Sequence, residues 1–202
     1  GSSGSGKTTL LNLILGLIKP TKGKILIDKK NIEQINLQKF WQDKIGYISQ
    51  NIFLIDDTIK NNIAIGESKV DKKKLAKVLK NSKLYNFVQS LPRKENTLIG
   101  NNGVKISGGQ HQRIGIARAL YRNPSFLVMD EATSALDFNT ENEILMDLDL
   151  KNSNTTAIVV SHRPRSVQDC DIVYYLEQGR IKDFGKYEQL QKKHKELKFN
   201  SN

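Results

Sequence analysis

The first nine residues have the types and spacing that most clearly indicate a chemical task. Gly1, Gly6, Lys7 and Thr8 fit the pattern G-x-x-x-x-G-K-[ST] in full. In such a loop, backbone N–H groups wrap phosphate oxygens, the lysine adds a mobile positive charge, and the threonine hydroxyl can ligate Mg²⁺. An apolar run at helical spacing, from Leu10 to Ile18, supplies the helix that the loop requires. We therefore predict a loop that binds the phosphates of a nucleoside triphosphate.

A Gly-Ser-Ser-Gly start can also be the remnant of an expression tag, which would carry no information about the fold. The complete motif and the helix that follows it favour the phosphate-binding loop. Gly1 is then the first residue of that loop, so the strand that normally leads into it is expected to lie outside these residues. Because the sequence also lacks an initiator methionine, we expect it to be a fragment of a longer polypeptide.

Two adjacent carboxylates, Asp130 and Glu131, follow the apolar run Phe126 to Met129. Such a strand delivers them to the carboxyl edge of a sheet, where α/β proteins bind their ligands. Successive strand residues point in opposite directions, so the two carboxylates can have different tasks. Asp130 suits the Mg²⁺ shell, and Glu131 suits the orientation and deprotonation of an attacking water. The alternative is an ordinary acidic turn, which the phosphate-binding loop makes less favoured.

A third cluster lies at Ser107, Gly108 and Gly109, before an apolar pattern of helical period. A hydroxyl, bare glycine N–H groups and a helix N-terminus together can form a second anion site. The alternative is a capped surface helix with a flexible start. One nucleotide does not need two such cradles on one chain, so the second one indicates that two chains assemble.

The composition limits the class of protein. The 202 residues, 38% hydrophobic and 26% charged, suit one globular domain, with or without an insertion. The apolar run Leu10 to Ile18 is far shorter than the about 20 residues that span a bilayer. The net charge of +11 comes largely from lysine runs typical of solvated faces. Aromatic interleaving is lacking, so we expect no nucleic-acid partner, whereas a basic surface also fits an anionic membrane leaflet. The single cysteine, Cys170, suits a reducing compartment.

The order of the apolar segments predicts an α/β fold with a mainly parallel sheet. Strands are expected at residues 24–28, 44–49, 125–130, 156–161 and 171–177. Helices without a convincing strand among them are expected at 57–65, 71–90 and 107–122, and a last helix from Lys186 onward. We therefore predict a core lobe of about residues 1–50 and 123–202, with a helical subdomain of about 51–122 inserted into it.

Together these features resemble the nucleotide-binding domain of an ATP-binding cassette (ABC) protein, truncated at its Walker A loop. The resemblance runs from Gly1 to about Leu190 and implies a P-loop NTPase core. Six motifs occur in the order that the family has: Walker A at residues 1–9, the Q-loop at Gln50, the signature ISGGQ at 106–110, Walker B at 126–131, the D-loop SALD at 134–137 and the switch histidine at His162.

The resemblance implies ATP as the ligand and Mg²⁺ as the cofactor, and it assigns roles to individual residues. The catalytic residues would be Glu131, His162 and Gln50. The metal would be held by Thr8, Gln50 and Asp130. The residues expected to bind the nucleotide are Gly1, Ser2, Ser3, Gly4, Ser5, Gly6, Lys7, Thr8, Thr9, Ser107, Gly108, Gly109, Gln110 and Asp137.

The family also implies partners. Two such domains pack head to tail as a homodimer or a heterodimer, with two ATP molecules between them. Ser107 and Gly109 would then reach ATP bound to the other subunit, and Asp137 would lie at the boundary. The stretch after Gln50 and the stretch TLIGNNG resemble exporter-type cassettes, although Asn101 replaces the glutamate of the latter pattern. A transmembrane domain in the same polypeptide would hold the chain at the cytoplasmic face of the membrane. Ile52, Phe53 and Leu54 would contact that domain or belong to the subdomain core.

We therefore expect an ATPase that drives export or flipping of a substrate across a membrane. A non-transport ABC ATPase acting on nucleic acid or ribosomes is the alternative, although the coiled-coil insertions or second cassette typical of that class are not seen. A module that binds ATP without turnover is less favoured, because Glu131 and His162 are both present. The cargo stays open between lipid, lipid-linked sugar, peptide and drug.

Overall fold

The computed structural model describes residues 1–33, 37–100, 103–132, 135–148, 154–161, 164–194 and 197. The chain divides into two compact units, one formed by Gly1–Asp43 with Val159–Asn202 and the other by Lys44–Ile158. No helix among the described residues is long and apolar enough to cross a membrane. The predicted division into a core lobe and a helical subdomain stays a prediction.

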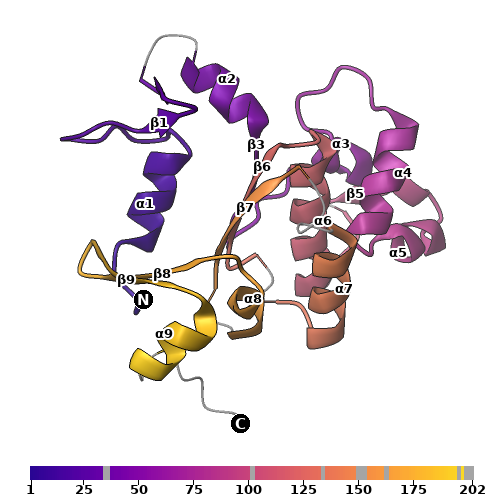
Figure 1. The fold of residues 1–202 in the computed structure, drawn as a ribbon. Coiled ribbons are helices and arrows are strands. Elements are labelled where there is room, and N and C mark those ends of the chain that lie inside the picture. The colour runs from indigo at the N-terminus through magenta and orange to yellow at the C-terminus, as the bar shows by residue number, and fades with distance from the viewer. Residues whose placement is uncertain are drawn as a thin grey trace. The chain divides into compact units, whose positions relative to one another are not determined.

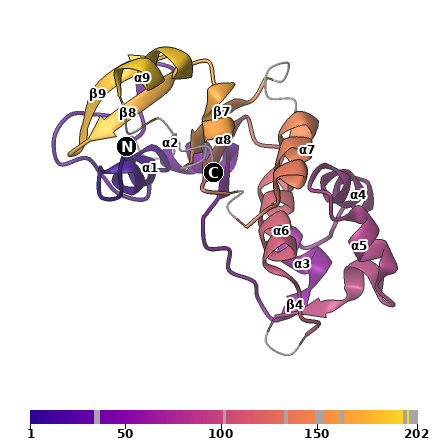
Figure 2. The same ribbon diagram turned by 90° about the horizontal axis from the view of Figure 1, so that it is seen from below.

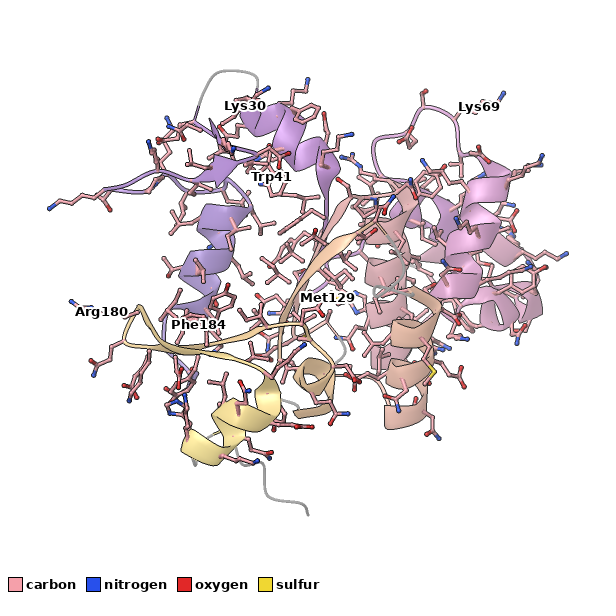
Figure 3. All side chains as sticks on the ribbon, viewed as in Figure 1. Lys30, Trp41, Lys69, Met129, Arg180 and Phe184 are labelled. Atoms are coloured by element: carbon pink, nitrogen blue, oxygen red, sulfur yellow. The ribbon has the colours of Figure 1, made fainter. Side chains whose placement is uncertain are left out.

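The first unit combines a helix at the start of the chain with two hairpins. Its elements are α1 (Lys7–Ile14), β1 (Leu26–Ile27), β2 (Lys30–Asn31), α2 (Leu37–Lys44, which ends at the unit boundary), α8 (Pro164–Gln168), β8 (Val173–Glu177), β9 (Arg180–Gly185) and α9 (Tyr187–Lys193). The N-terminus lies beside the β8–β9 hairpin (Figures 1 and 2). Trp41, labelled in Figure 3, joins α2 to α1, because its indole N–H donates to the Ile14 carbonyl at 2.7 Å.

The two hairpins of this unit turn through pairs of residues with left-handed backbone. Asp28 and Lys29 have φ of 47° and 67°, and Gln178 and Gly179 have φ of 48° and 74°. Two central residues with positive φ are the mark of a type I′ turn, whose twist matches that of the flanking strands. The segments predicted at 24–28 and 171–177 therefore join antiparallel pairs, β1 with β2 and β8 with β9.

The second unit places helices around α6 and strands beside it (Figure 2). Its elements are β3 (Ile45–Ile48), β4 (Asp57–Thr58), α3 (Ile59–Ile63), α4 (Lys72–Asn81), α5 (Tyr85–Ser90), the 3₁₀ helix η1 (Lys94–Asn96), β5 (Leu98–Ile99), α6 (Gly108–Tyr121), β6 (Phe126–Asp130), α7 (Phe138–Leu148) and β7 (Thr156–Val160, in which the unit boundary falls). The sheet order is β3-β6-β7, and β3 and β6 run parallel. Ile114 and Ala117 of α6 are fully buried in a core that α3, α4 and α5 complete.

The α/β class and the parallel pairing predicted from the sequence are confirmed, and most predicted helices form. Two predictions within 51–122 are wrong. Residues 57 and 58 are a strand that pairs with β5, and the helix begins only at Ile59, because the Thr58 hydroxyl caps it by accepting from Asn61 N–H. The helix predicted at 71–90 is two helices, because Lys83 takes a left-handed φ of 55° between them.

Candidate functional site

The glycine-rich loop of the first unit turns sharply into α1. Gly4 and Gly6 have φ of 77° and 99°, a backbone that residues with side chains rarely adopt. Gly6 is the N-cap of α1, and no side chain caps this helix start. The N–H groups of the first helical turn are therefore available to an anion, which the positive end of the helix dipole favours. Ser2, Ser3, Thr8 and Thr9 are exposed around this turn.

Lys7 lies over the loop that it is predicted to serve. Its ammonium donates to the carbonyl oxygens of Gly1 at 2.9 Å and Ser2 at 2.8 Å, and it lies 3.5 Å from the hydroxyl of the buried Ser5. A positive charge held by the loop's own carbonyls is placed at the mouth of the turn, where phosphate oxygens can replace those carbonyls as its partners.

The loop is also tied to the β8–β9 turn. Gly179 N–H donates to the Ser5 carbonyl at 3.0 Å. A Cβ on Gly6 would lie 3.2 Å from the Gly179 Cα, and a Cβ on Gly1 would lie 2.0 Å from the Leu176 carbonyl oxygen. The glycines of the loop therefore allow the close approach of two backbones as well as the turn itself.

In the second unit, the parallel pairing of β3 and β6 brings Gln50 and Glu131 together. Both strands end at the same edge of the sheet, and each of these residues follows the end of its strand. Gln50 Nε2 donates to Glu131 Oε2 at 2.7 Å. Glu131 has a left-handed φ of 50°, although it is not a glycine. The arrangement holds one carboxylate at a fixed place beside an amide, as a general base for water requires.

Asp130 lies at the end of the same strand. Burial, and then the negative charge of Asp130, raise the pKa of the Tyr47 phenol above its ordinary value. Tyr47 stands on β3 opposite Val128 of β6, two residues before Asp130. Asp130 and Gln50 offer oxygen atoms of the kind that Mg²⁺ prefers.

The residues at the start of α6 cap the N-terminus of that helix. The Ser107 hydroxyl accepts from Gln110 N–H at 3.2 Å, and Gln110 Oε1 accepts from Ser107 N–H at 2.9 Å. This reciprocal capping box satisfies the backbone N–H groups of Ser107 and Gln110. Gly108, in the first turn of the helix, is exposed. The pattern S-x-x-Q is typical of such a box, so the capped helix that the sequence analysis gave as the alternative forms at this position.

Two residues have roles that sequence reasoning missed. The Asp137 carboxylate accepts from the hydroxyl of Thr140 at 2.6 Å and from its N–H at 3.0 Å, which lowers the pKa of Asp137 and caps the start of α7. Gln112 is only 4% exposed, and its amide bonds to the backbone of both Glu131 and Ala135. Nothing in the sequence distinguishes Gln112 from other polar residues of a helix.

The remaining predicted residues divide as follows. His162, Ser134 of the D-loop and Asn101 lie outside the described residues. The three predicted magnesium ligands belong to different units, Thr8 to the first and Gln50 and Asp130 to the second. The residues 1–9 thus stand together in one unit, and Gln50, Glu131 and the start of α6 stand in the other.

Comparisons with known proteins show which family the chain belongs to. The model of the family described as "ABC transporter" matches residues 1–134. The chain is 39% identical over 193 residues to an ATP-dependent lipid A-core flippase of Cupriavidus pinatubonensis. It is 42% identical over 191 residues to the flippase of the same name from Francisella tularensis, and 40% identical over 191 residues to that of Coxiella burnetii. Each match covers 94% of this chain but only 31–32% of the relative.

A solved structure, titled as that of a bacterial Atm1-family ABC exporter with ATP bound, is similar in fold. Its TM-score is 0.89 at 36% sequence identity, and the match covers 96% of this chain and 34% of the exporter chain. The chain therefore spans about a third of the length of the proteins that it matches.

Proposed function

This chain belongs to the ABC transporter family, and on that premise we propose that it is the ATP-hydrolysing domain of an exporter or flippase. The observation that carries the proposal is the bond of 2.7 Å from Gln50 to Glu131, because it fixes a carboxylate where the family's general base is expected. The names of the relatives, ATP-dependent flippases and an ATP-bound exporter, support the coupling of hydrolysis to transport.

Binding of ATP depends on the first unit. The backbone N–H groups of residues 4–9 and the Lys7 ammonium bind the phosphates. Glu131 orients the attacking water and accepts its proton, while Gln50 holds the carboxylate in place. By its match to the family's switch histidine, His162 would contact the γ-phosphate.

Mg²⁺ fits the oxygen donors that the chain offers, which are the exposed Thr8 hydroxyl, the Gln50 amide oxygen and the Asp130 carboxylate. When bound, the ion neutralises phosphate charge and orients the phosphates. These three residues would hold it.

The proposed partner is a second such domain, packed head to tail. Ser107 and Gly109 of one chain would contact ATP held by the other, and the exposed turn at the start of α6 supports this. Asp137 would lie near the subunit boundary. A transmembrane domain is the other proposed partner, because the relatives are about three times as long as this chain. Phe53, 76% exposed, offers that domain an apolar contact, and the chain would then lie at the cytoplasmic face of the membrane.

The substitution Glu131→Gln, made in the protein at its full natural length, tests the proposal. The amide cannot take a proton from water, so the rate of ATP hydrolysis is expected to fall by about 10²–10⁴-fold while ATP binding persists. The matched control is Glu143→Gln, which removes a carboxylate on α7 that only pairs with Lys83 among the described residues at 3.4 Å. Hydrolysis that survives Glu131→Gln at the unmutated rate would show that Glu131 is not the base.

A further inference from the structure

Gln112 links two backbone segments that the proposed chemistry uses. It lies in the second turn of α6, and the residue is 4% exposed. Its Nε2 donates to the Glu131 carbonyl at 3.3 Å, and its Oε1 accepts from Ala135 N–H at 2.8 Å. A single buried amide therefore holds both ends of the stretch 131–135.

The hydrogen bond to the Glu131 carbonyl is made at a residue whose backbone conformation is strained. Glu131 has a φ of 50°, a conformation that costs free energy for any residue except glycine and persists when the surroundings hold it. Its side chain is held by Gln50 at 2.7 Å. With Gln112 on the backbone and Gln50 on the carboxylate, the residue is restrained at both ends.

The bond to Ala135 reaches the segment that leads into α7. The start of α6 lies against the same segment, because a Cβ on Gly109 would lie 3.5 Å from the Ala135 carbonyl oxygen and 3.7 Å from Leu136 Cδ2. Two residues further on, Asp137 caps α7. A shift of this segment therefore changes the hydrogen bond that Gln112 makes, and the other end of the same amide is on Glu131.

We propose that Gln112 is a positioning residue for ATP hydrolysis, which ties the backbone of Glu131 to that of Ala135. It keeps the Glu131 carboxylate aimed, and it passes a displacement of the segment before α7 to that carboxylate. The inference rests on the proposed function, in which Glu131 is the base and Asp137 lies near a second subunit. Gln112 itself contacts neither ATP nor water in this role.

The test is Gln112→Met in the protein at its full natural length. Methionine has a similar length and volume but can make neither hydrogen bond, so the core stays filled while the link is lost. A misplaced general base lowers the rate of the chemical step. We therefore expect kcat to fall by about ten- to a hundred-fold. The KM for ATP and the ATP affinity stay within about twofold, because no group that binds ATP is removed.

Two further variants separate positioning from a general structural effect. Gln89→Met makes the same exchange on α5, where the amide has no hydrogen bond within the described part of the chain, and it should leave kcat unchanged. In a Glu131→Ala background, the residual single-turnover hydrolysis should not fall further when Gln112→Met is added, since there is no carboxylate left to position. If Gln112→Met does not fold, Gln112→Asn takes its place, because it keeps an amide but is one methylene too short to span both partners.

The outcomes are distinct. A protein that hydrolyses ATP, loses activity with Glu131→Gln and keeps its full kcat with Gln112→Met overturns the inference and leaves the proposed function intact. A rise in KM at constant kcat, or an equal loss in the Glu131→Ala background, also overturns it. A protein without any ATP hydrolysis contradicts the proposed function itself.

Discussion

Gly115, in the middle of α6, lies against the side chain of Ile52, and the free energy of this packing can be measured. A Cβ at this position would lie 2.2 Å from Ile52 Cδ1 and 2.7 Å from its Cγ1. Carbon atoms in ordinary contact lie about 3.5–4.0 Å apart. In Gly115→Ala, the Ile52 side chain must therefore move by more than an ångström, or the segment after Gln50 must move with it.

Two opposing effects set the size of the change. Replacing glycine by alanine in a helix interior stabilises the fold by about 0.5–1 kcal/mol. Overpacking costs about 1–3 kcal/mol. Ile52 is half-buried and can yield partly toward solvent, so we expect Gly115→Ala to be near neutral or to destabilise by at most about 2 kcal/mol.

A double-mutant cycle with Ile52→Ala isolates the contact. In the Ile52→Ala background the clash is gone, so Gly115→Ala should stabilise by about 0.5–1 kcal/mol. Urea unfolding followed by far-ultraviolet circular dichroism measures the four free energies of unfolding. The coupling expected between the two positions is about 1–3 kcal/mol. If Gly115→Ala has the same effect in both backgrounds, within about 0.5 kcal/mol, the packing of Ile52 on Gly115 is refuted.

Two more predictions concern the sharing of the site between two chains and the N-cap of α4. Ser107→Arg and Lys7→Ala should each abolish ATP hydrolysis, and mixing the two proteins should restore up to half of the activity in each mixed dimer; a Ser107→Arg protein with the unmutated rate contradicts sharing of the site between chains. Asp71 accepts from Lys74 N–H and Lys73 N–H, and these bonds hold its pKa below the ordinary value. The stability that the ionised cap contributes is present above the unfolded pKa of about 3.9 and is lost as the pH falls through the lower folded pKa. Asp71→Asn keeps a cap without a titration, so urea unfolding at pH 6 and pH 3 should show a smaller acid loss for the variant; equal losses would contradict the role of the carboxylate.

Local signals in the sequence identified the elements that have strong caps or continuous apolar runs. Ser107 begins α6 as predicted, and β6 ends at the predicted carboxylates. The β8–β9 hairpin was missed in part because its turn places Gln178, a residue without preference for positive φ, in left-handed backbone. The strands β4 and β5 are two residues long, which is too short for any apolar pattern.

The site was less accessible to local reasoning. Gln50 and Glu131 are 81 residues apart, and only the parallel pairing of two strands brings them into contact. The left-handed backbone of Glu131 and the bridge through Gln112 depend on that tertiary arrangement, so neither has a local signature. Of the apolar stretch after Gln50, Leu54 packs against the helical core whereas Phe53 is exposed, and the sequence alone could not separate the two.

Trp41 gives the molecule a built-in optical reporter. It is the sole tryptophan of the sequence, and its indole N–H is bonded to the last turn of the helix that begins at Lys7. Tryptophan emission shifts with the polarity and hydrogen bonding around the indole, so the fluorescence of these 202 residues by themselves reads the state of the first unit. The second unit supplies most of the helical signal but no tryptophan. A fluorescence transition that separates from the dichroism transition during unfolding would therefore show that the two units melt independently, and a change in emission on adding nucleotide would report occupancy of the loop without any attached label.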